Sequence, residues 1–148
     1  MVLFLDVVTI VSAAVLVGNE AAVWIFINPI LRQLDEGSQG RAVSLFAARL
    51  GKAMPFWYAF SLLLLILEAF LRRQGSGGRW LMASCCIWVA VIILTMIFLV
   101  PINNRLANLD STPMTDQAKR EHRKWDTLHK GRVVLLAVSL VCLLVGIR

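Results

Sequence analysis

Four long apolar segments, separated by stretches that carry most of the charged residues, dominate the hydrophobic pattern of this chain. A helix that crosses a membrane needs roughly 20 apolar residues, and the four segments have about that length. The pattern therefore predicts an all-α membrane protein, a four-transmembrane-helix bundle that forms a single domain over residues 1–148. We expect the spans at about residues 7–31, 53–71, 80–100 and 133–147, with a helix over 113–132 continuous with the fourth.

Residues with special backbone properties mark two of the expected helix ends. Thr112 suits an N-cap, Pro113 suits the first position of a helix, and Asp116 favours a helix N-terminus. Pro101 has no backbone N–H and crowds the preceding turn, so we expect it to interrupt the third helix. The break would free backbone carbonyls near the edge of the bilayer.

Short similar stretches recur in the two halves of the chain. Pro29 and Pro101 lie close to the ends of the first and third segments, each within two residues of an asparagine. In the second and fourth segments, Ser61 and Ser139 fall at the same offset from a preceding lysine. Two tandem helical hairpins around an axis normal to the membrane would explain this repeat, and chance similarity between apolar segments is the alternative.

Charged residues make up 16% of the sequence, below the quarter that is usual for a soluble domain. Eleven of the 15 Lys and Arg residues fall in the first and third loops, which predicts that these long loops are cytoplasmic and both termini outside. We expect the net charge of +6 to face anionic lipid headgroups of the bilayer, and we expect no nucleic-acid partner. The first segment lacks a basic leading region, which favours a retained helix over a cleaved signal peptide.

Glu20 lies past the middle of the first span, where a carboxylate is costly and therefore informative. One interpretation is a hydrogen-bonded or protonated glutamate that locks two helices together. The others are a group in a functional site and a side chain exposed near the interface. The opposite helix face carries Ala14, Gly18 and Ala22, a spacing of small residues that permits close approach of another helix.

A second polar feature is the stripe His122, Trp125, His129 and Arg132, whose spacing places all four residues on one helical face. Histidine is the side chain best suited to move a proton near neutral pH, so His129 is a candidate base. The alternative is a solvated interfacial helix anchored by Trp125. Both histidines lie roughly 10 Å apart along a helix, too far to share a metal ion.

Glu20 and His129 alone would be a thin ligand set, so we expect no metal. The three cysteines form neither a disulfide framework nor a metal-binding pattern.

Asn103 and Asn104 follow Pro101, and their amides could hydrogen-bond a carbonyl or enolate oxygen. They could equally serve as residues that end a helix well.

Three motifs together carry a family resemblance: Gly18-Asn19-Glu20, Pro101-Ile102-Asn103-Asn104, and residues 125–132, Trp-Asp-Thr-Leu-His-Lys-Gly-Arg. With four apolar spans, the chain resembles the anthrone-oxygenase-like family of small membrane proteins, also catalogued as domain of unknown function 1772. The resemblance implies a four-helix membrane bundle. It also implies an oxygenase that oxidises an anthrone to an anthraquinone with molecular oxygen and without an obvious cofactor.

The resemblance and the chemistry of an anthrone together suggest roles for the catalytic residues. An anthrone has an acidic methylene group, and loss of a proton gives an electron-rich anion that can reduce oxygen directly. His129 would be the base, with Glu20 as an alternative base or proton relay. Asn103 and Asn104 would hydrogen-bond the developing oxyanion.

Substrate binding would use Trp125, which would stack on the aromatic face, and Arg132, which would favour the anion. The substrate expected is a small, flat, lipophilic aromatic molecule held between helices. Two other functions remain open: a non-catalytic protein that binds a lipophilic or quinone-like ligand, and a structural subunit that docks through Ala14, Gly18 and Ala22. The oligomeric state is also open, a homo-oligomer included.

Overall fold

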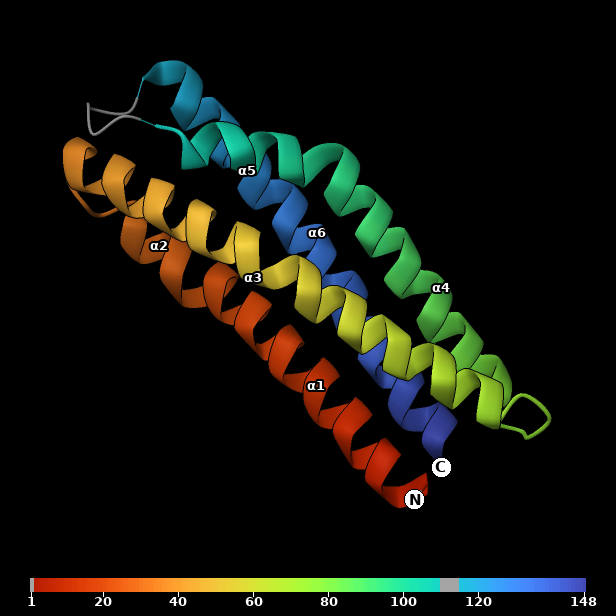
Figure 1. The fold of residues 1–148 in the computed structure, drawn as a ribbon. Coiled ribbons are helices and arrows are strands. Elements are labelled where there is room, and N and C mark those ends of the chain that lie inside the picture. Colours follow the sequence, from red (N-terminus) through yellow and green to blue (C-terminus); the bar gives the residue numbers. More distant parts are fainter. Residues whose placement is uncertain (1, 110–114) are drawn as a thin grey trace.

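The computed structural model describes residues 2–109 and 115–148, which form a bundle of four long helical rods running alternately up and down (Figure 1). All four rods are long and apolar enough to cross a membrane, which confirms the predicted fold class. In chain order the helices are α1 (Val2–Ala22), the π-helical turn η1 (Val23–Ile27), α2 (Asn28–Leu31), α3 (Glu36–Leu71), α4 (Gly78–Leu94), the π-helical turn η2 (Thr95–Leu99), α5 (Val100–Ala107) and α6 (Asp116–Ile147).

The second and fourth rods extend well beyond the apolar segments that predicted them. α3 begins at Glu36, so much of the expected first loop is helical. Asp35 caps this helix by accepting a hydrogen bond from the Ser38 N–H at 3.0 Å. Hydrogen bonding by the side chain of Ser38, and then by its backbone N–H, lowers the pKa of the Asp35 carboxyl. The extension is stable because Val43 and Ala47 pack against the rest of the bundle.

α6 is one unbroken helix that contains both the polar stripe and the last apolar segment. Its N-cap is Thr115, whose hydroxyl accepts from the Ala118 N–H at 3.2 Å. The predicted capping residues Thr112 and Pro113 lie outside the described residues.

Pro101 does not interrupt the third rod, contrary to expectation, because the helix continues through it to Ala107. The π-helical turn η2 lies directly before Val100-Pro101, and η1 lies directly before Asn28-Pro29. A proline lacks its own N–H and crowds the carbonyl four residues earlier. A wider π-helical turn accommodates both effects without a break, and such turns are frequent at functional sites.

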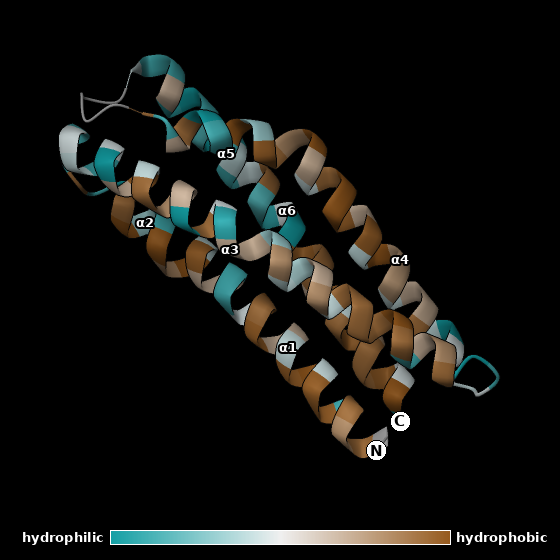
Figure 2. Ribbon diagram, viewed as in Figure 1, coloured by the Kyte–Doolittle hydropathy of each residue, from teal (hydrophilic) through white to brown (hydrophobic). Residues whose placement is uncertain are grey.

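Each rod packs against two neighbours, so α1 contacts α3 and α6, and α4 contacts the same two helices from the other side. The centre contains fully buried large side chains, among them Leu16, Leu65, Trp88 and Leu136. Many other large apolar side chains are exposed along the rods, as expected for surfaces that face lipid (Figure 2). The protein is therefore an integral membrane protein in its architecture.

Hydrophilic residues concentrate where α2, α5 and the starts of α3 and α6 meet (Figure 2). We call this the basic end, after its exposed residues Arg32, Arg41, Arg105 and Arg123. Both chain termini lie at the opposite end (Figure 1). There Arg72 of α3 pairs with Asp6 of α1 at 2.6 Å and with the buried Glu68. Which end faces the cytoplasm stays a prediction.

Two equivalent serine pairs relate the hairpin α1–α3 to the hairpin formed by α4 and α6. Ser12 and Ser61 are hydrogen-bonded at 2.9 Å, and Ser84 and Ser139 at 2.8 Å. Ser84 follows Ser12 at the same chain separation by which Pro101 follows Pro29. The structure thus supports two similar hairpins.

Helices α4 and α6 approach each other closely at Gly146, where a Cβ atom would lie 2.7 Å from Leu81 Cγ. We expect Gly146→Ala to destabilise the protein by about 1–3 kcal/mol through overpacking. Gly131→Ala, on the same helix with nothing within 4 Å of its Cβ position, should be neutral or stabilising by up to about 1 kcal/mol. Thermal unfolding in detergent measures both, and equal midpoints would contradict the prediction.

Candidate functional site

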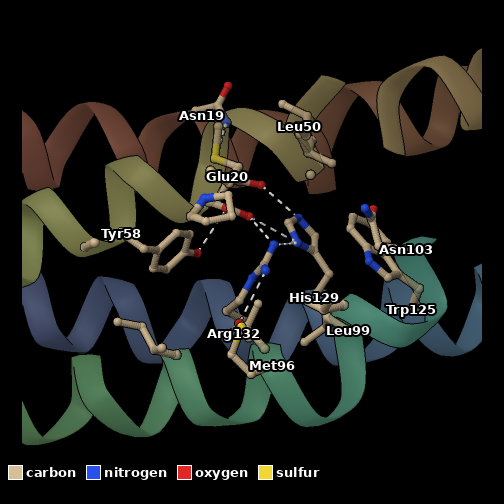
Figure 3. A pocket seen from close by; sticks show the side chains of 18 residues that line it. Asn19, Glu20, Leu50, Tyr58, Met96, Leu99, Asn103, Trp125, His129 and Arg132 are labelled. Carbon is tan, nitrogen blue, oxygen red and sulfur yellow. Dashed lines mark hydrogen bonds and ion pairs between the residues drawn. The ribbon is translucent and has the colours of Figure 1, made fainter. Parts of the chain in front are cut away.

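A cavity of about 210 Å³ lies inside the bundle and is lined by residues of all four rods. We call it the main cavity. Most of its wall is apolar, and the cluster of Glu20, His129 and Arg132 comes from α1 and α6 (Figure 3). Glu20, Asn103, Trp125, His129 and Arg132, all predicted from the sequence, line it.

Glu20 and Arg132 form a buried ion pair across the cavity wall. The Arg132 Nη2 donates to Glu20 Oε2 at 2.5 Å, and the Tyr58 hydroxyl donates to Glu20 Oε1 at 3.0 Å. Both charged side chains are less than a tenth exposed. Glu20 therefore connects helices and lines a cavity at once, so the two main interpretations of this residue are compatible.

The hydrogen bonds of His129 define its protonation. Its Nε2 lies 3.0 Å from the backbone oxygen of Glu20, which can only accept, so Nε2 carries a proton. Its Nδ1 lies 2.8 Å from Arg132 Nη2, which can only donate, and 3.2 Å from Glu20 Oε2, which accepts. The shorter contact gives Nδ1 the acceptor role. His129 is thus neutral in this arrangement, and the lone pair of Nδ1 is directed at Arg132 (Figure 3).

The predicted stripe on α6 forms a column of stacked rings. The indole of Trp125 lies 4.7 Å from the His129 ring and 6.5 Å from the His122 ring, nearly parallel to both. The indole therefore lies between the two imidazoles and presents mainly its edge to the main cavity. Stacking of a substrate on Trp125 stays a prediction, and it would require an imidazole to move.

The two predicted asparagines differ in position. Asn103 lines the main cavity, and its Nδ2 donates to the Ala47 backbone oxygen at 3.0 Å. Gly51 gives this amide room, since a Cβ there would lie 2.7 Å from Asn103 Nδ2. Asn104 is exposed on α5 and does not line the main cavity.

Two residues of the polar group were not predicted. Tyr58 hydrogen-bonds Glu20, and Thr95 in η2 is 3.5 Å from Arg132 Nη1. The available signal was that Tyr58 is the single tyrosine of the chain and lies in an apolar span. The Nε of Arg132 is buried and has no hydrogen-bond partner among the residues that the structure describes. A ligand oxygen could satisfy it.

Glu20 and His129 are in direct contact, with 3.2 Å between Glu20 Oε2 and His129 Nδ1. The Arg132 guanidinium hydrogen-bonds both side chains, so the Glu20 carboxylate already has a cationic partner. In the described ranges, no three His, Cys, Asp or Glu side chains lie close enough to hold an ion.

The main cavity has an opening toward the outer surface of the bundle. Its exposed lining residues are Gly51, Pro55 and Ala59 on α3 and Met96 on η2. The opening therefore lies between α3 and η2, on a surface that faces the apolar part of the bilayer. A lipophilic molecule could enter there directly from the membrane.

Residues 43–142, about two thirds of the chain, match the anthrone oxygenase family. The chain belongs to this family. The matched region contains Tyr58, Asn103, Trp125, His129 and Arg132, whereas Glu20 lies outside it. No curated protein and no solved structure matches the sequence. Family membership supports an oxygenase-like function.

The buried ion pair should dominate the stability of the site. We expect Arg132→Met alone to cost about 3–5 kcal/mol, because it leaves the Glu20 charge buried without a partner. The double variant Glu20→Leu, Arg132→Met should recover most of that loss, since no charge remains. Unfolding midpoints in detergent measure this cycle.

The matched control is Arg105→Met, which removes an exposed ion pair with Glu121 and should cost about 1 kcal/mol or less. If the double variant lost as much stability as Glu20→Leu and Arg132→Met together, Glu20 and Arg132 would not interact.

Proposed function

We propose that this protein is a membrane-embedded, cofactor-independent oxygenase that acts on a planar, lipophilic, anthrone-like substrate. The observation that carries the proposal is the buried group of Glu20, His129 and Arg132 at the wall of an apolar cavity, in a member of the anthrone oxygenase family. The cavity supplies a mostly apolar site, and the polar group supplies a base and a cation.

The reaction converts a methylene group to a carbonyl group with one molecule of oxygen. A base removes one methylene proton, and the resulting anion transfers an electron to O2. The substrate radical and superoxide combine to form a peroxide at the same carbon. The O–O bond then breaks with loss of the second proton, and one water leaves. Substrate CH2 and O2 thus become C=O and H2O, with no external reductant.

His129 is the proposed base, and Arg132 Nη2 hydrogen-bonds the lone pair of its Nδ1. The Nδ1 of His129 can accept a substrate proton only when Arg132 releases it. A developing oxyanion on the substrate would draw the guanidinium away, so that binding of the anion and release of the base would be coupled. Glu20 would hold Arg132 in place and is the alternative base or proton relay.

The remaining contacts support a flat aromatic ligand. Asn103 has donor capacity left for a substrate oxygen, beyond its bond to the Ala47 carbonyl. Trp125 contributes the edge of its indole to the wall. Asn104 is left out of the proposed site because it lies outside the cavity lining. Substrate and O2 are both soluble in the bilayer core, and the opening between α3 and η2 faces it.

The direct test is turnover of an anthrone such as emodin anthrone by purified protein in detergent under air. We expect quinone formation above the spontaneous rate, followed by absorbance. His129→Ala should lower the rate about 10²- to 10⁴-fold, the usual contribution of a general base. Thr127→Ala, an exposed change on the same helix, should have no effect.

Other outcomes distinguish the alternatives. Full turnover by His129→Ala would exclude His129 as the base. Anthrone binding without turnover would identify a non-catalytic binding protein. Stoichiometric metal in the active sample would contradict a cofactor-independent reaction.

If the substrate enters the main cavity from the bilayer, a large side chain at the opening should slow the reaction. Ala59→Trp should lower kcat/KM about tenfold, equal to about 1.4 kcal/mol, because Ala59 lies at the exposed edge of the cavity. Ala90→Trp, on the exposed surface of α4 away from the lining, is the matched control. Steady-state kinetics in proteoliposomes measure both, and equal values would place the entrance elsewhere.

A further inference from the structure

A smaller cavity of about 40 Å³ adjoins the main cavity toward the basic end. The two cavities share the lining residues Val23, Leu50, Asn103 and Trp125, so these four residues lie at their common boundary. The smaller cavity also has polar lining groups, including His122.

His122 is the residue that indicates what the smaller cavity contains. It is 6% exposed and lines the smaller cavity, and its ring nitrogens are not among the fully buried unpartnered atoms of the described residues, so a partner or accessible space is available to them. A buried imidazole normally has a hydrogen-bond partner. The amides of Asn28 and Asn103 line the same space, and two to four polar partners are what a buried water requires. The volume is sufficient for at least one water molecule.

A chain of hydrogen-bonded and ion-paired side chains, which we call the polar track, continues from the smaller cavity to the surface of the basic end. The Asn28 Nδ2 donates to Asp126 Oδ1 at 2.7 Å. Asp126 in turn pairs with Arg32 and, at 3.2 Å, with Lys130. Arg32 and Lys130 are each more than two fifths exposed, so the track reaches solvent.

We propose that the smaller cavity is a hydrated passage that connects the main cavity to the basic end, with water bound by His122, Asn28 and Asn103. The opening between α3 and η2 is apolar and suits substrate and oxygen, but it offers no path for water. The passage would let product water leave the main cavity. This role rests on the proposed function, because oxidation of a methylene group by O2 forms one water in each turnover. The passage itself does not depend on catalysis.

Thiol accessibility to silver ion tests the passage, because this small cation does not enter lipid. Single cysteines are placed in a variant in which Cys85, Cys86 and Cys142 are alanine, and the protein is reconstituted in liposomes. Ala47→Cys probes the smaller cavity and Ile92→Cys the main cavity. Ala13→Cys probes the packed core. Free thiols remaining after silver treatment are counted by maleimide labelling of the unfolded protein.

We expect the thiols of Ala47→Cys and Ile92→Cys to react at least about tenfold faster than that of Ala13→Cys. Ala47→Phe, which fills the smaller cavity, should slow reaction of the Ile92→Cys thiol about tenfold, and His122→Phe should slow it as well. Ala48→Phe is the matched control, since Ala48 neighbours Ala47 but does not line the cavity. All variants are first checked for an unchanged elution volume and unfolding midpoint.

Protection of the Ile92→Cys thiol equal to that of Ala13→Cys would overturn the proposal. A rate unaffected by Ala47→Phe would overturn it too, because water would then enter by another path. Reactive thiols in a protein without oxygenase turnover would support the passage and contradict only the proposed function. Oxygenase turnover in a protein with protected thiols would contradict only the passage.

Discussion

The ion pair between Glu20 and Arg132 is the interaction on which the rest of the site depends. Inside a membrane-spanning bundle neither charge can be solvated by bulk water, so each requires the other. The pair joins α1 to α6, positions the Tyr58 hydroxyl, and places a guanidinium donor against His129 Nδ1. One electrostatic requirement therefore fixes helix packing, the protonation of the histidine and the polarity of one cavity wall together.

The surroundings of this pair divide the bundle into three environments. The core between the pair and the chain termini is packed with large apolar side chains such as Leu65 and Trp88. The main cavity is apolar and borders the lipid-facing surface. The space beyond Trp125 has a mostly apolar wall that includes the polar side chains of Asn28, Asn103 and His122, and Asn28 links it to the ion pairs of Asp126. The proposed reaction, which combines two lipid-soluble reactants and forms water, would use the second and third of these environments.

Much of this arrangement could be predicted from the sequence, because polar residues at membrane depth are rare and costly. Glu20 was recognisable for that reason, and helical spacing placed His129 and Arg132 on one face. Tyr58 was not recognised, since a tyrosine in an apolar span has an ordinary structural explanation. The exposed position of Asn104 and the covered faces of Trp125 depend on side-chain packing between distant segments, which spacing alone does not determine. The predicted interruption at Pro101 was wrong because a π-helical turn accommodates the proline.

The two similar hairpins explain why there is a cavity at all. By the offsets that relate the paired serines, Glu20 corresponds to Ile92, His129 to Gly51 and Arg132 to Met54, and these three counterparts all line the main cavity. One half of the fold carries the charges, and the other half carries smaller or apolar residues at the equivalent places. A perfectly symmetric pair of hairpins would have either two charged clusters facing each other or none. The difference between the two similar hairpins thus gives the cavity one wall with charged residues and one wall without them.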